Sequence, residues 1–154
     1  MIETNFNLQN DQNFDFDRYK NLVEKKSTNK TLSKLEAREL VWYKAFIQEH
    51  VFYEHRLEYK NLLTQFIEKK INGQQFVIQF HEIEKKHYKI ADGLFNDFQF
   101  LKTFQVNVNA NNFCIIIDML SEICFGIRSE GEVLNEDNLY GWVQESFLKL
   151  KEIC

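Results

Sequence analysis

The feature that most constrains the fold of this 154-residue chain is a long apolar pattern of helical period in a sequence without proline. Between residues 31 and 71 neither proline nor glycine occurs, and apolar side chains recur mostly at steps of three and four. They are Leu35, Leu40, Tyr43, Phe46, Ile47, Val51, Leu57, Leu62, Leu63, Phe66 and Ile67. This spacing predicts either one helix of about 35–40 residues or two nearly collinear helices with a break near residues 50–56.

Polar residues at fixed offsets mark the boundaries of these helices. Ser33 followed by Glu36 matches a capping box at a helix start. Asn72-Gly73 predicts a helix end, because glycine accepts the left-handed conformation that closes a helix. We expect a further helix from about Gln74 to Tyr88, followed by a turn at residues 91–93.

The second half of the chain contains two clearer helical patterns and one ambiguous segment. Residues 94–109 begin with many phenylalanines, so helix and strand both remain open there. Residues 112–125 read as a central helix. Asn135 is a suitable cap for a last helix whose apolar stripe includes Trp142, which we expect in the core.

Together these patterns predict an all-α protein, a helical bundle with a four-helix-type core. A long N-terminal helix and a disordered tail would precede the bundle. We expect residues 1–30 to be mostly disordered or weakly helical, since residues 1–13 are rich in Asn and Gln. Residues 31–154 then form a single helical domain, within which residues 60–152 form the bundle.

Several kinds of chemistry lack the residues they need. The three cysteines form no CxxC pair, and the four histidines form no HExxH motif. One ExxH spacing joins Glu84 to His87, whereas a di-iron bundle needs two such motifs. The five glycines are scattered, and no nucleophile lies in a recognisable turn. We therefore expect no metal, no cofactor and no enzymatic activity.

The charge of the chain is unevenly distributed. Residues 1–110 contain 16 Lys and Arg against 15 Asp and Glu, a net charge of +1, while residues 111–154 contain 3 against 8, a net charge of −5. The acidic excess gathers in residues 128–137. An acidic face suits a basic partner, although a solvated surface has the same composition. The basic clusters at residues 69–70 and 85–89 flank one helix, and we expect them to face solvent rather than nucleic acid.

Three segments of the chain resemble one protein family. They are LTQFIEKKINGQQFVIQF at residues 63–80, IDMLSEIC at 117–124, and LNEDNL at 134–139 followed by Val143 and Leu148. In this order they are similar to the colicin D immunity proteins, small all-helical inhibitors of a tRNA-cleaving toxin. The resemblance covers residues from about 60 to 152. Residues 1–59 have no counterpart in the family.

The resemblance implies a site and a partner. In this family, carboxylates are thought to fill the active site of the ribonuclease in place of RNA phosphates. The carboxylates in the matching regions are Asp118, Glu122, Glu130, Glu132, Glu136 and Asp137. Tyr140 is an apolar anchor beside them. The implied partner is a basic ribonuclease toxin, with no direct contact to nucleic acid.

A second hypothesis from another class remains open. The abundance of Asn, Lys, Ile and Phe is typical of an AT-rich genome, such as that of a low-GC bacterium or an algal plastid. The chain would then be a helical interaction or assembly protein with no toxin target. We expect it in the bacterial cytoplasm or plastid stroma, with no secretion signal and no membrane span. The long helix also offers a surface for a homodimer.

Overall fold

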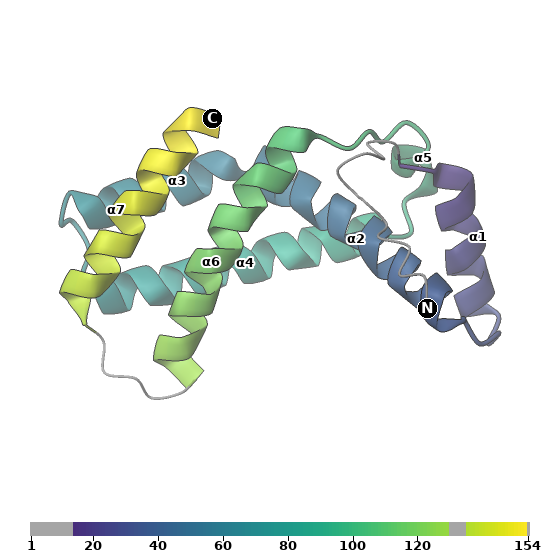
Figure 1. Ribbon diagram of the computed structural model, residues 1–154, viewed down its shortest axis with the longest axis horizontal. Coiled ribbons are helices and arrows are strands. Elements are labelled where there is room, and N and C mark those ends of the chain that lie inside the picture. Colours follow the sequence, from purple (N-terminus) through teal and green to yellow (C-terminus); the bar gives the residue numbers. More distant parts are fainter. Residues whose placement is uncertain (1–13, 130–134, 154) are drawn as a thin grey trace, which may run out of the picture.

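The computed structural model describes residues 14–129 and 135–153, with residues 127–129 described by their backbone alone. Within this part of the chain there are seven helices and no strand, which confirms the all-α prediction (Figure 1). In chain order the helices are α1 (Phe16–Ser27), α2 (Lys34–Glu54), α3 (Arg56–Ile67), α4 (Gly73–Leu94), α5 (Phe98–Leu101), α6 (Val108–Ser129) and α7 (Glu136–Ile153).

The helices enclose two hydrophobic cores rather than one. The larger core joins the end of α2 to α3, α4, α6 and α7, and it fits the four-helix-type core that we expected. The smaller core joins α1, the first half of α2, α5 and the residues around α5. Because α2 and α4 extend into both halves, they connect the two cores (Figure 1).

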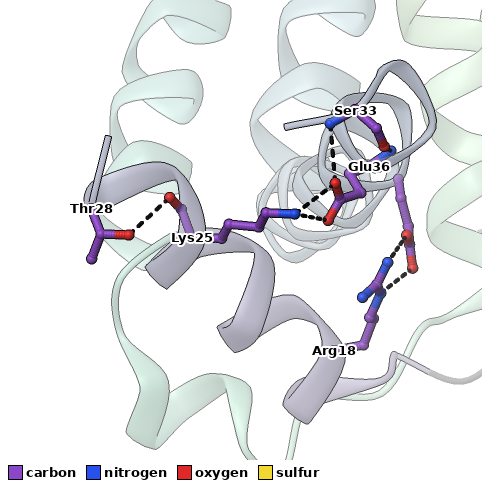
Figure 2. Close-up of polar contacts among 6 residues, drawn as sticks. Arg18, Lys25, Thr28, Ser33 and Glu36 are labelled. Atoms are coloured by element: carbon purple, nitrogen blue, oxygen red, sulfur yellow. Dashed lines mark hydrogen bonds and ion pairs between the residues drawn. The ribbon is translucent and has the colours of Figure 1, made fainter. Parts of the chain in front are cut away.

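Helix α1 packs on α2, so of the two alternatives expected for residues 1–30 the helical one holds for Phe16–Ser27, which forms part of the smaller core instead of a loose tail. Tyr19 is fully buried, and its hydroxyl donates a hydrogen bond of 2.6 Å to the Phe95 carbonyl oxygen. Figure 2 shows Lys25 of α1 meeting both carboxylate oxygens of Glu36, at 2.9 Å each. The Lys25 hydrogen bond lowers the pKa of Glu36 to about 2. Residues 1–13 lie outside the described part.

The long apolar pattern corresponds to two helices separated at His55, within the predicted break. Ser33 and Glu36 form the expected capping box of α2. Asn72-Gly73 does not end a helix, as we predicted, but begins one. Asn72 caps the start of α4 through a second capping box with Gln75. The turn after α3 instead uses Lys69, whose φ of 60° is left-handed.

Three further boundaries differ from the prediction. Helix α4 continues through residues 91–93, where we expected a turn, and ends at Leu94. Within the aromatic segment 94–109, the residues between α4 and α6 contain only the four-residue α5, because the phenylalanines follow the shape of the smaller core rather than a helical face. Trp142 is 43% exposed, at the edge of the α7 stripe rather than in the core.

Helix α6 is the most apolar helix. Its residues Val108–Gly126 have a mean hydropathy of 1.2 and are long and apolar enough to cross a membrane, judged by length and composition alone. In this fold, 39% of that segment is buried, and α6 packs against α2, α4 and α7. Core helices have the same composition, so the value alone does not indicate a membrane span.

Candidate functional site

The structure places the described members of the predicted acidic site in two groups. The first group, Glu136, Asp137 and Tyr140, lies at the start of α7. A hollow of about 370 Å³ opens where these residues meet the turn between α3 and α4. It is lined by Phe66, Lys69, Lys70, Ile71, Asn72, Glu136, Asp137 and Tyr140.

Two side chains of this group hold α7 against the turn. The Gly73 backbone N–H donates a hydrogen bond of 2.5 Å to Glu136 Oε1, so this carboxylate meets the positive end of the α4 dipole. The Tyr140 hydroxyl donates to the Ile67 carbonyl oxygen at 3.2 Å. Glu136 and Tyr140 therefore have structural roles in addition to any binding role.

Basic side chains accompany the acidic ones around this hollow. The Lys69 ammonium lies 5.8 Å from the centre of the Tyr140 ring, and Lys70 lines the same hollow while pairing with Glu68 at 2.7 Å. Asp137, in the first turn of α7, is exposed and lines the same hollow as these lysines. The local charge is therefore mixed, which leaves little acidic excess for a basic partner at the α7 start.

The second group surrounds the middle of α6. Asp118 and Glu122 lie on exposed positions one turn apart on this helix. The charge of Asp118 acts on Glu49 of α2 and Glu84 of α4, and both of these are removed from water to a larger extent than Asp118. We name these four side chains, Glu49, Glu84, Asp118 and Glu122, the α6 carboxylate cluster.

Burial and mutual repulsion act on the cluster in the same direction. Burial raises the pKa of Glu49, Glu84 and Asp118, and the neighbouring carboxylates raise each of them further. Hydrogen bonds offset part of this effect. Asn111 donates to Glu49 Oε1 at 3.1 Å, and Ser121 bonds to Glu84. Glu49 Oε2 is buried without a hydrogen-bond partner.

The cluster has no counter-charge in the described part of the protein. The ion pairs found there involve Glu24, Glu36, Glu39, Glu58, Glu68 and Glu145, but no member of the cluster. In the same part, no group of three or more His, Cys, Asp or Glu side chains has an arrangement that could hold a metal ion. Among the residues whose side chains are described, no ion pair offsets the negative charge that the cluster carries when its members are ionised.

Two predicted site residues, Glu130 and Glu132, lie outside the described residues. They belong to the segment between α6 and α7. The two groups described above are thus the part of the predicted site for which side-chain positions are known.

A second polar network joins α3 to α4. His87 is fully buried, with Nδ1 at 2.9 Å from the Tyr59 hydroxyl and Nε2 at 3.0 Å from Glu58 Oε2. Because a carboxylate only accepts, Nε2 carries a hydrogen, and in the neutral ring Tyr59 donates to Nδ1. Lys86 pairs with the other Glu58 oxygen at 2.8 Å, and the His55 ring centre lies 4.5 Å from that of His87.

This network runs from the partly exposed Glu58 and Lys86 into the core. Tyr59, at its inner end, is fully buried in the larger core and stacks on Phe52. Burial lowers the pKa of His87 and raises that of Tyr59, so both are neutral near pH 7. We interpret the network as a structural link between α3 and α4.

The sequence did not predict which residues of other helices join the α6 carboxylate cluster or the His87 network. The apolar spacing placed His87 on the apolar face of its helix, and this position predicted its burial. For Glu84 we expected exposure to solvent. Glu84 is 7% exposed. Glu49 lies on α2, well before the segments that resemble the immunity family, and no local pattern pointed to it.

Comparisons with known proteins add no further identification. Scans of family models, of curated proteins and of solved structures found nothing that matches this chain.

Proposed function

We propose that this protein is a binding protein without catalytic activity, which uses the α6 carboxylate cluster to hold basic side chains of a protein partner. The observation that carries this proposal is the electrostatic state of the cluster. Four carboxylates from three helices lie close enough to repel one another pairwise. Asp118 acts on Glu49 and Glu84, and Glu122 acts on Asp118. No ion pair of the described residues neutralises them.

A basic partner would supply what the cluster lacks. A lysine or arginine placed beside Asp118 and Glu122 forms charge-assisted hydrogen bonds and removes the repulsion between the carboxylates. The same field attracts the partner before contact, which raises the association rate and makes it sensitive to salt. Glu49 and Glu84 strengthen this field from beneath the surface.

The resemblance to the colicin D immunity proteins supports a particular class of partner, a tRNA-cleaving ribonuclease. Such an enzyme has a basic surface for RNA phosphates, to which carboxylates are also complementary. In this proposal Asp118 and Glu122 form the main contact. Asp137 and Tyr140 form a second contact at the start of α7, together with Glu130 and Glu132 of the preceding segment.

The alternative function uses the same surface for another basic protein. A helical assembly protein of a low-GC bacterium or a plastid, as the composition indicates, would need the same complementarity of charge. The exposed apolar side chains of Leu35 and Val41 on α2 leave room for the homodimer that we expected through the long helix.

The experiment is an inhibition assay with a tRNA-cleaving ribonuclease domain of the colicin D type. We expect this protein to slow tRNA cleavage, and to do so less effectively as the salt concentration rises. Asp118→Lys combined with Glu122→Lys should abolish the inhibition, while circular dichroism should show unchanged helicity.

The matched control is Glu145→Lys combined with Glu152→Lys on the exposed face of α7, which changes the net charge by the same amount. This control should inhibit like the unmodified protein. Equal loss in both double variants would mean that only the total charge matters. Binding of the ribonuclease without any effect on cleavage would favour the alternative function.

A further inference from the structure

The outward face of α6 is unusually apolar for a surface that also carries the carboxylates. Its large hydrophobic residues Ile115 and Phe125 are 61% and 66% exposed. Val108 and Met119 are exposed as well, by 48% and 37%. Up to Gly126, the charged residues of α6 are Asp118 and Glu122. The face therefore combines water-exposed apolar area with negative charge and no positive charge.

Helical geometry places these side chains on one stripe. At about 100° per residue, the six positions 108, 115, 118, 119, 122 and 125 lie within roughly a third of the helix circumference. The stripe extends over about 26 Å of helix, from Val108 to Phe125. Asp118 lies near its middle and Glu122 about one turn further on, with apolar residues before, between and after them.

Tyr88 of α4 borders the same region. It is 41% exposed, and burial together with the nearby Glu84 and Asp118 raises the pKa of its phenol. A half-exposed tyrosine beside carboxylates provides a ring face for a cation and an apolar edge for an interface. The stripe is thereby widened on the side of α4.

Two other occupants fit this stripe poorly. A second copy packed antiparallel by twofold symmetry over the whole stripe would bring Asp118 within about one turn of the same residue of its partner, because Asp118 lies near the middle of the stripe. Like charges would then face each other across the interface. An anionic lipid surface would be repelled by the same two carboxylates.

We propose that the outward stripe of α6 is a docking seam for an amphipathic helix of the partner, a helix with apolar residues at i, i+3 or i+4, and i+7 and with Arg or Lys at its middle. This inference rests on the proposed function and specifies the form of the partner. Apolar side chains of the partner helix cover Ile115, Met119 and Phe125, while its basic side chains reach Asp118 and Glu122. Charge complementarity and apolar contact together fix the register of the partner helix along α6.

The test uses the full chain and synthetic helical peptides of about 18 residues, long enough to cover the stripe. One peptide carries a leucine stripe with arginines at its middle, and a second carries glutamates there instead. Binding is measured by fluorescence anisotropy, and the binding surface is mapped by NMR chemical shifts. We expect the arginine peptide alone to bind and to shift the amide signals of α6.

Ile115→Ser and Phe125→Ser should each lower the affinity for the arginine peptide by roughly tenfold. The matched controls Val41→Ser and Leu57→Ser remove apolar side chains that are 62% and 65% exposed on α2 and α3. Both control variants should bind the arginine peptide with the affinity of the unmodified protein. Equal binding of both peptides, shifts on another helix, or equal losses in the controls would overturn the inference. So would binding to phosphatidylcholine vesicles that Ile115→Ser abolishes, which would make the stripe a membrane surface.

The same variants separate this inference from the proposed function. If Ile115→Ser inhibits the ribonuclease normally while Asp118→Lys with Glu122→Lys does not, the proposed function stands and the docking seam is wrong. If the arginine peptide binds the stripe but the ribonuclease is not inhibited, the seam stands and the ribonuclease is the wrong partner.

Discussion

At the scale of single residues, the acidic side chains of this protein fall into two kinds. Glu36 and Glu39 pair with cations of α1, and the Lys25 hydrogen bond lowers the pKa of Glu36 to about 2. Glu49, Glu84 and Asp118 have no such partner, and burial raises their pKa. The first kind stabilises the fold near neutral pH, whereas the second kind destabilises it there. This contrast is why we assign binding to the second kind.

The sequence predicted part of this distinction. Asp118 and Glu122 share one helix four residues apart, so their proximity could be predicted from spacing alone. Glu49 and Glu84 reach the same place from α2 and α4, through contacts between distant segments that no local pattern encodes. Glu130 and Glu132, which the family resemblance favoured, lie outside the described residues.

His87 provides a prediction about pH. Burial lowers the pKa of this histidine, so the unfolded chain gains a proton from about pH 6.5 downward while the folded protein does not. The free energy of unfolding should therefore fall as the pH drops from 7 toward 5, with a slope of up to about 1.4 kcal/mol per pH unit from this group. Urea unfolding at several pH values measures the slope.

The neighbours of His87 define the controls. Partial burial also lowers the pKa of His50, which adds to the slope, while the raised pKa values of Glu49 and Glu84 oppose it at lower pH. His87→Gln should reduce the slope, and His81→Gln, at an exposed position of the same helix, should leave it unchanged. An NMR titration of the wild type in which the His87 imidazole titrates above pH 6.5 would contradict this account.

At the scale of helices, the capping signals of the sequence were more informative than the apolar spacing. Ser33 and Asn135 begin helices as predicted, since their side chains accept from the backbone three residues ahead. Asn72 caps α4 in the same way, although we had predicted a helix end there. The helix ends were harder to predict, because α3 stops at a left-handed lysine and α4 continues through Gly93. Segment 94–109 follows the shape of the smaller core, which only the tertiary structure defines.

The contact between α7 and α4 gives a prediction about one element. Glu136→Ala leaves the Gly73 N–H without its carboxylate partner and should lower the free energy of unfolding by about 1 kcal/mol. Urea unfolding followed by circular dichroism measures the change. Glu145→Ala on the exposed face of the same helix should change stability by less than about 0.5 kcal/mol. A Glu136→Ala variant as stable as this control would show that the cap is unimportant.

At the scale of the whole molecule, α2 and α4 couple the two cores. We expect one cooperative unfolding transition, which both tryptophans should report, because Trp42 lies on α2 between members of the smaller core and Trp142 lies on α7 beside the larger core. Ile47→Ala in the smaller core and Phe80→Ala in the larger core should each lower the stability of this single transition by about 2–5 kcal/mol.

Single-tryptophan variants distinguish the two ends of the molecule in that experiment. Trp42→Phe reports the larger core alone, and Trp142→Phe reports the smaller core alone. Coincident urea midpoints in the two variants are the expected result. Separate midpoints, with Ile47→Ala shifting only the Trp142→Phe signal, would show that the cores unfold independently.

The central claim is that the α6 carboxylate cluster exists for binding at a cost to stability. The most direct measurement determines both quantities on one variant, Asp118→Asn combined with Glu122→Gln, with a tRNA-cleaving ribonuclease domain of the colicin D type as the partner. We predict that affinity falls at least about tenfold while the free energy of unfolding rises by about 0.5 kcal/mol, because like-charge repulsion is removed. Unchanged affinity, or a loss of stability in this variant, would contradict the account.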